Sequence, residues 1–220
     1  MSRFLGLALL LLAPPAAAQV SALEARTCEP RGVTIERPDE ARDRREEAER
    51  YRGNAQNVSR QGDHLILKLE AGATVELVDC PYGDTARSYL YDRFDEAGPF
   101  YVVRKSGRED FSYVLVNKSS GRLHEAYASP IWSTDKVRFV TVACSLSPPR
   151  GILTIVAPSG DGLATEAEFP LPCEEQTCSA RWDFQSWVSV SCTPHDSSGK
   201  KGAEFVLMRG NDKAWRKFGR

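Results

Sequence analysis

The fold of this chain is decided by residues 113–144, which read YVLVNKSSGRLHEAYASPIWSTDKVRFVTVAC. Two short runs rich in β-branched and aromatic residues, 113–116 and 137–144, are typical of strands. Between them, Gly121 marks a hairpin turn and Trp132 marks a second turn that carries an aromatic ring. The stretch therefore predicts a hairpin, an aromatic turn and a buried strand that ends in a cysteine.

The same pattern occurs again further along the chain. The hairpin that begins at 113–116 is repeated from 153–156, and a third copy begins at 205–208. The strand FVTVAC, residues 139–144, aligns position for position with WVSVSC, residues 187–192. Such self-similarity is the signature of a repeat architecture. We interpret the repeated stretch as an architectural unit, so function must be sought on the surfaces that it supports.

The turn PIWSTD, residues 130–135, is similar to the P-x-W-S-x-D turn of the WD40-like repeats in periplasmic β-propellers. The resemblance extends over about residues 113–218. It implies blades in which Trp132 packs between neighbours while the serine and aspartate satisfy backbone groups of the turn. Lys136 follows the aspartate, where the family usually has a glycine, and the second copy, SARWDF, lacks both the proline and the Ser-x-Asp pattern.

Strand-like patterns continue through residues 63–220, and no long helical period appears among them. We predict an all-β domain there, a propeller-like or meander sheet of repeated hairpins braced by disulfides. Blades of about 40–45 residues would number at most four in this length, so a minimal closed propeller, an open set of meanders and a β-sandwich are alternatives. The expected strands cover residues 65–69, 74–80, 88–91, 100–105, 113–116, 122–126, 137–144, 152–156, 163–169, 187–192, 205–208 and 214–218.

The N-terminal part differs from the rest in composition. Residues 1–18 combine a basic start, an apolar run and an A-x-A ending, the pattern of a secretory signal peptide. Residues 19–62 form a charged arm, in which 36–52 carries opposite charges at i,i+4 spacing but no apolar stripe. We predict a solvated helix or partly ordered arm, with a helix that docks on a partner as the alternative, followed by a linker over 53–62.

All six cysteines follow the predicted signal peptide. An even number behind such a signal implies up to three disulfides in an oxidising compartment. The alternative, a zinc site, is disfavoured because C-x4-C is loose spacing and no second pair matches it. No stretch is apolar enough to span a membrane, so we expect a periplasmic or secreted protein without a transmembrane segment. The expected pairs are Cys173–Cys178, Cys144–Cys192 and Cys28–Cys80.

The sequence carries few signs of chemistry. His64, His124 and His195 have no second histidine at metal-site spacing, and we expect neither a metal nor a cofactor. No G-x-S-x-G, S-x-x-K, H-E-x-x-H or phosphate-loop motif is present. The formal net charge of -1 gives no field that favours nucleic acid. We therefore lean toward a protein that is not an enzyme.

Aromatic residues and arginines are concentrated between residues 82 and 113. If the outward members of this set form a patch, they suit a protein or glycan of the cell envelope. We predict an exported, non-enzymatic binding or scaffold protein. The alternatives are an envelope-polymer hydrolase or lyase that uses loop carboxylates, and a secreted enzyme inhibitor. The candidate binding residues are Tyr89, Tyr91, Arg93, Tyr101 and Arg104.

Overall fold

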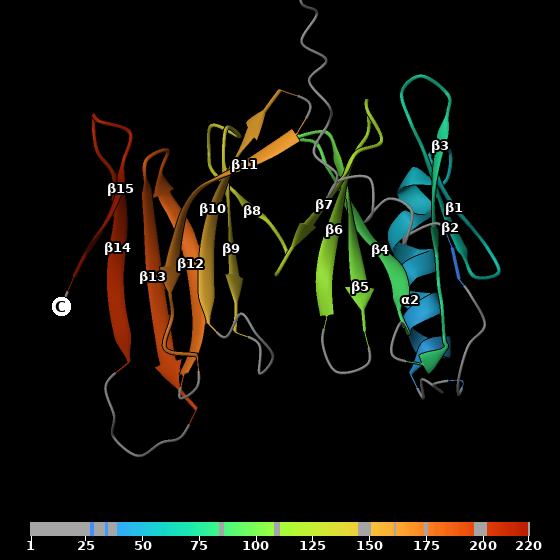
Figure 1. Cartoon of the computed structure of the whole chain (residues 1–220), viewed down its shortest axis with the longest axis horizontal. Coiled ribbons are helices and arrows are strands. Elements are labelled where there is room, and N and C mark those ends of the chain that lie inside the picture. The colour runs from blue at the N-terminus through green and yellow to red at the C-terminus, as the bar shows by residue number, and fades with distance from the viewer. Residues whose placement is uncertain are drawn as a thin grey trace, which may run out of the picture.

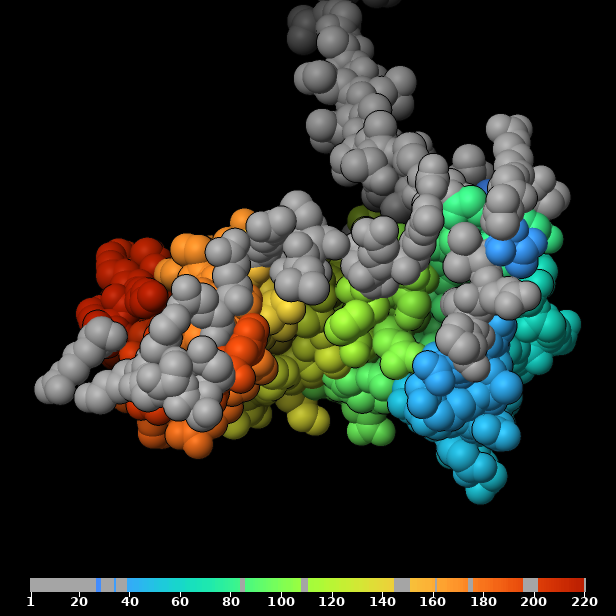
Figure 2. Space-filling model, turned by 90° about the horizontal axis from the view of Figure 1, so that it is seen from below, coloured from blue at the N-terminus to red at the C-terminus, as the bar shows by residue number. Residues whose placement is uncertain are grey.

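The computed structural model describes residues 27–28, 34, 39–83, 86–107, 111–144, 151–160, 162–173, 176–195 and 202–219. The predicted signal peptide, residues 1–18, lies outside these ranges. The described residues form four antiparallel sheets that stand side by side in a row, with the first and last sheets at opposite ends (Figures 1 and 2). The all-β prediction is confirmed, and the sheets form an open row instead of a closed ring.

The first sheet has three strands in the order β1-β2-β3. They are β1 (Val58–Gln61), β2 (His64–Lys68) and β3 (Thr74–Val78). The predicted linker over 53–62 is therefore wrong in its second half, because β1 pairs with β2 from Val58↔Leu67 to Gln61↔His64. The turn between the two strands uses Gly62 at a φ of 58°, a conformation that glycine adopts without steric cost.

Each of the other three sheets is a four-stranded meander, in which strands adjacent in the chain are adjacent in the sheet. The repeated hairpins of the sequence become the third and fourth strands of these sheets. The second sheet contains β4 (Ser88–Asp95), β5 (Phe100–Ser106), β6 (Phe111–Asn117) and β7 (Leu123–Ala126); the third contains β8 (Ile131–Trp132), β9 (Phe139–Ala143), β10 (Ile152–Ser159) and β11 (Gly162–Pro170); the fourth contains β12 (Gln176–Phe184), β13 (Trp187–Pro194), β14 (Ala203–Arg209) and β15 (Trp215–Phe218).

Three apolar layers hold the row together, one between each pair of neighbouring sheets. Leu65 and Leu77 of the first sheet pack with Tyr101 of the second, and all three are completely buried. A smaller layer between the second and third sheets is built around Phe100 and Phe139. The third and largest layer joins the third and fourth sheets through the residues Val140, Leu153, Ile155, Val188, Val190, Cys192, Phe205, Leu207 and Trp215.

The turn that precedes β9 is held by hydrogen bonds of its own serine and aspartate side chains. The Ser133 hydroxyl donates to Asp135 Oδ1 at 2.6 Å and accepts from the Arg138 amide at 3.1 Å. Lys136 adopts a φ of 60°, the left-handed conformation for which a glycine would be less strained. The ring of Trp132 lies between Phe100 and Phe139, with ring centroids 6.4 and 5.0 Å away. Trp132 therefore packs between the second and third sheets.

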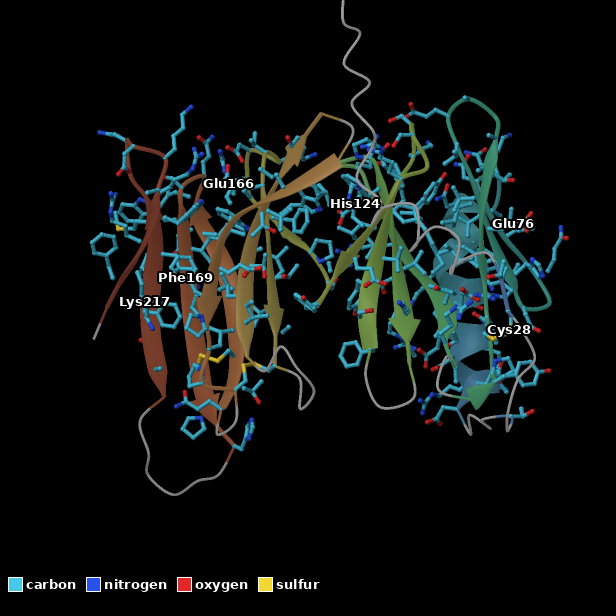
Figure 3. All side chains as sticks on the ribbon, viewed as in Figure 1. Cys28, Glu76, His124, Glu166, Phe169 and Lys217 are labelled. Carbon is cyan, nitrogen blue, oxygen red and sulfur yellow. A yellow bond between two sulfur atoms is a disulfide. The ribbon has the colours of Figure 1, made fainter. Side chains whose placement is uncertain are left out.

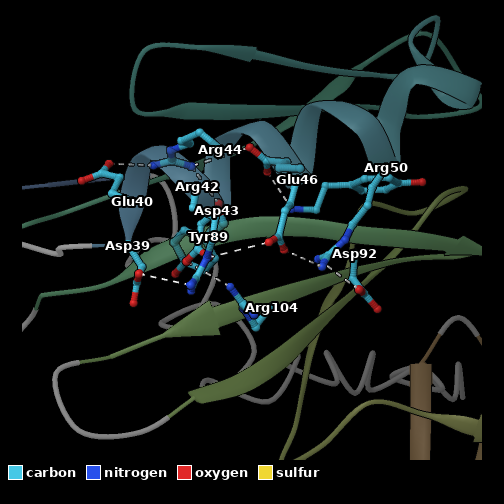
Figure 4. Close-up of polar contacts among 12 residues, drawn as sticks. Asp39, Glu40, Arg42, Asp43, Arg44, Glu46, Arg50, Tyr89, Asp92 and Arg104 are labelled. Atoms are coloured by element: carbon cyan, nitrogen blue, oxygen red, sulfur yellow. Dashed lines mark hydrogen bonds and ion pairs between the residues drawn. The ribbon is translucent and has the colours of Figure 1, made fainter.

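The charged arm contributes a helix that docks on its own chain. Helix α2 (Glu40–Tyr51) and the following 3-10 turn η1 (Arg52–Asn54) lie along β4, the edge strand of the second sheet (Figure 1). Its charged side chains bridge to this sheet, with Arg104 at 3.2 Å from Asp43 and Arg50 at 3.4 Å from Asp92 (Figure 4). The solvated face was predicted correctly for most of the helix, but its contact with the second sheet was not.

Two buried carboxylates accept hydrogen bonds from backbone N–H groups on the edge of β4 that faces away from β5. Glu47, only 1% exposed, accepts a hydrogen bond from the backbone N–H of Tyr91 at 2.7 Å. Asp79, 2% exposed, accepts from the backbone N–H of Tyr89 at 2.6 Å. Arg60 links the two acids, since its guanidinium is 2.5 Å from Glu47 and 3.3 Å from Asp79. Side chains thus satisfy strand amides that a fifth strand would otherwise have to pair.

Three disulfides are formed, and one of the three expected pairs is among them. Cys28 is bonded to Cys80, as predicted, and ties the N-terminal segment to the residues after β3. The pairs Cys173–Cys178 and Cys144–Cys192 are wrong. β12, a strand that the sequence analysis missed, places Cys178 directly opposite Cys192, whereas β9 and β13 lie in different sheets. The observed bonds are therefore Cys178–Cys192 and Cys144–Cys173.

No helix in the described part of the chain is long and apolar enough to cross a membrane. Disulfides persist in oxidising compartments and are rare in reducing ones. The three bonds therefore indicate a non-cytosolic setting.

Candidate functional site: the outward face of the last sheet

The predicted aromatic patch does not lie on the surface. Tyr89 and Tyr91 are 2% exposed and Tyr101 is fully buried, because their strand positions point into the layer between the first and second sheets. Burial raises the pKa of Tyr101 to about 12, with smaller contributions from Tyr91 and Glu70. Three of the five candidate binding residues are thus core residues, which is the usual fate of aromatic side chains in strands.

The two candidate arginines are half-exposed and have partners within the chain. Arg93 donates to the Pro130 carbonyl at 2.9 Å and to Ser129 at 2.8 Å, which joins β4 to the segment that leads into the third sheet. Arg104 contacts Asp43 on α2. Both side chains connect elements of the fold, and they do not lie with the tyrosines on one accessible surface.

A cleft of about 390 Å³ separates the second and third sheets. One wall is β7 with His124, which lies between the two sheets in Figure 3 and contacts the edge of Phe100. The other wall carries the neighbouring threonines Thr141 and Thr154, paired across β9 and β10. Two carboxylates also line it, and they are the ones relevant to a hydrolase: Glu125, held 2.6 Å from Lys105, and Glu168.

A larger hollow, about 530 Å³, lies on the outward face of the fourth sheet. The strand register places the side chains of this face in rows, because directly paired residues share a face. Phe184, Trp187 and Met208 form the first row. Arg181, Ser189, Val206 and Phe218 form the second row, and Ser179, Ser191 and Glu204 form the third.

Aromatic rings stand exposed at two places on this face. Phe184 is 62% exposed and Trp187 is 40% exposed, and their rings meet edge to face with centroids 5.3 Å apart. Phe218 is 49% exposed, two strands across and two residues along from Trp187. The strand spacings put the Cα atoms of Trp187 and Phe218 about 12 Å apart. The face therefore offers two exposed aromatic contact points, with Met208 and Val206 between them on β14.

Hydroxyl and charged groups lie beside these apolar side chains. Ser189 donates to Asp183, and Asp183 also lies 3.1 Å from Arg181, whose side chain is 80% exposed. Ser191 and Glu204 line the hollow beside them. Exposed serines, an arginine and a carboxylate supply both donors and acceptors at one surface.

The alternation along β13 explains why this face is polar. Val188, Val190 and Cys192 point toward the third sheet and are buried, whereas Ser189 and Ser191 point outward. Serines on the outer face are the pattern expected where a stack of sheets ends against water. The outward face of the fourth sheet is consequently polar along β13, which suits contact with water.

The first and fourth sheets, at the two ends of the row, differ in the large apolar side chains that they expose. The outward face of the first sheet carries Ser59, Ile66 and Glu76 side by side. Within the described residues, none of the large exposed apolar side chains belongs to that sheet, while Phe184, Trp187 and Phe218 all belong to the fourth. An exposed cluster of aromatic rings on one end alone is typical of a binding surface.

A network behind this face fixes the fourth sheet to the third. Glu166 of β11 accepts from Arg138 at 2.8 Å and from the Trp215 indole at 2.9 Å, and it lies 3.2 Å from Arg209. Partial burial works to raise the pKa of Glu166, but the bonds from Arg138 and Trp215 and the charges of Arg138 and Arg209 bring it below its usual value. These contacts on the inner face of the fourth sheet thus fix it to the third sheet.

The histidines and cysteines add no open metal site among the described residues. His64 pairs with Glu76 at 3.3 Å on the outward face of the first sheet, His124 lines the cleft, and His195 follows β13. Three cysteine sulfurs, those of Cys144, Cys173 and Cys178, lie within 4.8 Å of one another, and all three are bonded in disulfides.

The comparisons with known proteins give no relative for this arrangement. A scan against protein-family models, a search of curated proteins and a search of solved structures each found no match.

Sequence reasoning missed the outward face, although a signal for it was present. The strand WVSVSC aligns with FVTVAC, so Trp187 corresponds to Phe139. Phe139 is 1% exposed because the second sheet covers it, whereas Trp187 is exposed because no described sheet lies beyond the fourth. The sequence showed equivalent strands but not which of them would stand at the end of the row.

Proposed function

We propose that this protein is an exported, non-enzymatic binding protein of the cell envelope that holds a glycan on the outward face of its fourth sheet. The observation that carries the proposal is the exposure of Phe184, Trp187 and Phe218 on one face, next to the serines and charged groups that line the hollow there. The predicted signal peptide, together with the disulfides, supports placement in the periplasm or outside the cell.

The chemistry of a pyranose matches these two kinds of group. One face of the sugar ring presents C–H groups, which pack on the electron-rich face of an aromatic ring. Its hydroxyls both donate and accept hydrogen bonds, as do Ser189, Ser191, Arg181 and Glu204 together. A β-linked polysaccharide suits a sheet face on which the Cα atoms of Trp187 and Phe218 are about 12 Å apart, because successive sugars can reach both contact points.

A protein partner is the competing ligand for such a surface. Tryptophan and phenylalanine anchors serve protein interfaces as well, and those interfaces usually place the anchors in a fully desolvated centre. Here Met208 and Val206 lie between Trp187 and Phe218 on β14, and serines and charged groups border this apolar strip. That arrangement favours a ligand which is itself hydroxylated along its length.

The resemblance of the Trp132 turn to propeller repeats is compatible with this proposal. We relate the second to fourth sheets to propeller-type blades on that turn, with the blades left in an open row. The open arrangement leaves the outward face of the fourth sheet accessible, where a closed ring would cover it with another blade.

Sedimentation with particulate polysaccharide tests the proposal. Purified peptidoglycan and chitin are the probes, and the protein should pellet with at least one of them. Trp187→Ala and Phe218→Ala should each weaken binding by roughly tenfold or more, as loss of an aromatic anchor does. Phe111→Ala is the matched control, because Phe111 is 61% exposed but starts β6 in the second sheet. Equal loss in the control, or no retention on either polymer, would refute the proposal.

The carboxylates of the inter-sheet cleft justify one check on the hydrolase alternative. Glu125 and Glu168 come from β7 and β11 on the two walls of the cleft. The binding proposal predicts that incubation with the same polymers releases no new reducing ends. Release that disappears in Glu125→Gln or Glu168→Gln would replace it with an enzymatic function.

A further inference from the structure

Four of the six cysteines gather at one end of the third and fourth sheets. Cys144 follows β9, Cys173 lies between β11 and β12, and Cys178 and Cys192 face each other across β12 and β13. The sulfur of Cys178 lies within 4.8 Å of both sulfurs of the Cys144–Cys173 bond, and the two disulfides stand next to each other in Figure 3. A thiolate released from one bond is therefore close enough to attack the other.

The members of this cluster differ in accessibility. Cys144 is exposed, whereas Cys173 and Cys178 are 9% exposed and Cys192 is 1% exposed. An external thiolate can attack only a sulfur that it can reach. Cys144 is the accessible end of the pair of disulfides, and Cys173 is the buried leaving group next to the second bond.

We propose that the two disulfides form one thiol–disulfide exchange site that a dithiol reductant enters at Cys144. The first thiolate of the dithiol attacks the Cys144 sulfur, and the Cys144–Cys173 bond breaks to release the Cys173 thiolate. The second thiolate of the dithiol then attacks the mixed disulfide, which frees Cys144 and leaves the reductant as a cyclic disulfide. Two electrons pass to the protein in this step, and Cys144 takes up a proton.

The second step occurs within the protein. The Cys173 thiolate attacks the Cys178 sulfur, the Cys178–Cys192 bond breaks, and a Cys173–Cys178 bond forms. Cys192 leaves as a thiolate and takes up a proton. A movement of about 1–2 Å brings sulfurs at this separation to reacting distance. The product has one disulfide in the cluster and thiols at positions 144 and 192, so no electrons are gained or lost in this step.

The exchange would affect the outward face of the fourth sheet, because the Cys178–Cys192 bond links β12 and β13, which form part of that face. Ser179 follows Cys178 and Ser191 precedes Cys192, and both serines line the hollow. Exchange would remove this cross-link from β12 and β13 while it closes the short loop before β12. The site stands on the cysteine geometry alone and does not depend on what binds to the face.

Peptide mapping distinguishes the products. The native protein is treated with one equivalent of dithiothreitol, quenched with acid, alkylated and digested with trypsin. Cleavage after Arg138, Arg150, Arg181 and Lys200 puts Cys144 in one peptide, Cys173 with Cys178 in a second, and Cys192 in a third. Exchange predicts three separate peptides, with label on Cys144 and Cys192 and an unlabelled internal bridge in residues 151–181.

Three other results would overturn the proposal. One is label on Cys144 and Cys173 with the Cys178–Cys192 peptides still joined, because reduction would then stop at the first bond. A second is primary reduction of Cys28–Cys80, which would mean that Cys144 is not the preferred entry. The third is bridges between Cys28 or Cys80 and the cluster, since these would report unfolding.

The double variant Cys144→Ser with Cys173→Ser tests the entry point separately. The Cys178–Cys192 bond should then resist the same dithiol at least tenfold longer than it does in the native protein. Tryptophan fluorescence checks that the variant is folded before it is used, and the native protein treated in parallel is the reference. Reduction of Cys178–Cys192 at the native rate would show that it is attacked directly and would contradict the coupling.

Discussion

The Glu47 carboxylate of α2 accepts a hydrogen bond from the backbone N–H of Tyr91, 2.7 Å away on the edge of the second sheet. A side chain here takes the place of a missing strand, and its charge is balanced by Arg60. The helix is thus part of the body of the protein, although nearly every residue in it is charged.

Replacing this buried carboxylate should strongly destabilise the fold. Glu47→Gln leaves the Arg60 guanidinium beside an amide that cannot accept both of its bonds, and breaking a buried ion pair in this way costs about 3–5 kcal/mol. Glu49→Gln is the control, because the Glu49 side chain is 64% exposed and pairs with Arg52 on the surface. The free energy of unfolding in urea should fall for the first variant and stay within about 0.5 kcal/mol for the second. Equal effects would show that Glu47 is not a buried partner.

Acid should weaken the contact between the third and fourth sheets through Glu166. Its folded-state pKa lies below the ordinary value. Its contribution to stability is therefore present above the unfolded pKa of about 4.3 and is lost as the pH falls through the lower folded value. Glu166→Gln should be less stable than the native protein near neutrality, and the difference should shrink below about pH 4. Urea unfolding at several pH values measures this, and a difference independent of pH would contradict the assignment.

Gly98 should not tolerate a side chain. A Cβ there would lie 2.5 Å from the ring of Trp132, which is itself packed between Phe100 and Phe139. Gly98→Ala should therefore cost about 1–3 kcal/mol of stability, the usual result of overpacking. Gly53→Ala serves as the comparison, because its Cβ would meet nothing within 4 Å. Thermal unfolding of both variants gives the result, and a neutral Gly98→Ala would mean that the Trp132 ring moves freely.

Most of the architecture could be predicted from the sequence, and the reasons are local. Strand patterns such as that of 139–144 need only neighbouring residues to be recognised, and the meander connects strands that are consecutive in the chain. The position of a strand within the row could not be predicted from such local patterns. Tyr101 and Trp187 both belong to strand patterns, yet one is fully buried and the other is exposed, because only the order of sheets decides which faces are covered.

The contacts that the sequence did not reveal join distant segments. Glu47 reaches Tyr91 across 44 residues, and its burial inside a charged helix has no periodic signal. The cysteine pairs required the position of β12, which lies outside every strand range that the sequence predicts. Once Cys178 is placed on a strand, its partner follows from the register with β13.

An NMR titration that follows the indole N–H signals tests most directly whether the outward face of the fourth sheet binds a glycan. The chain has four tryptophans, and Trp187 is the one on the outward face of the fourth sheet, whereas Trp132, Trp182 and Trp215 pack against the layers between sheets. A β-linked oligosaccharide of the polymer retained in sedimentation, such as a chitin oligosaccharide, is the titrant. We expect a saturable shift of the Trp187 signal, with the other three nearly unchanged. Shifts at Trp132 with Trp187 unmoved would place the ligand in the inter-sheet cleft and contradict the proposed surface.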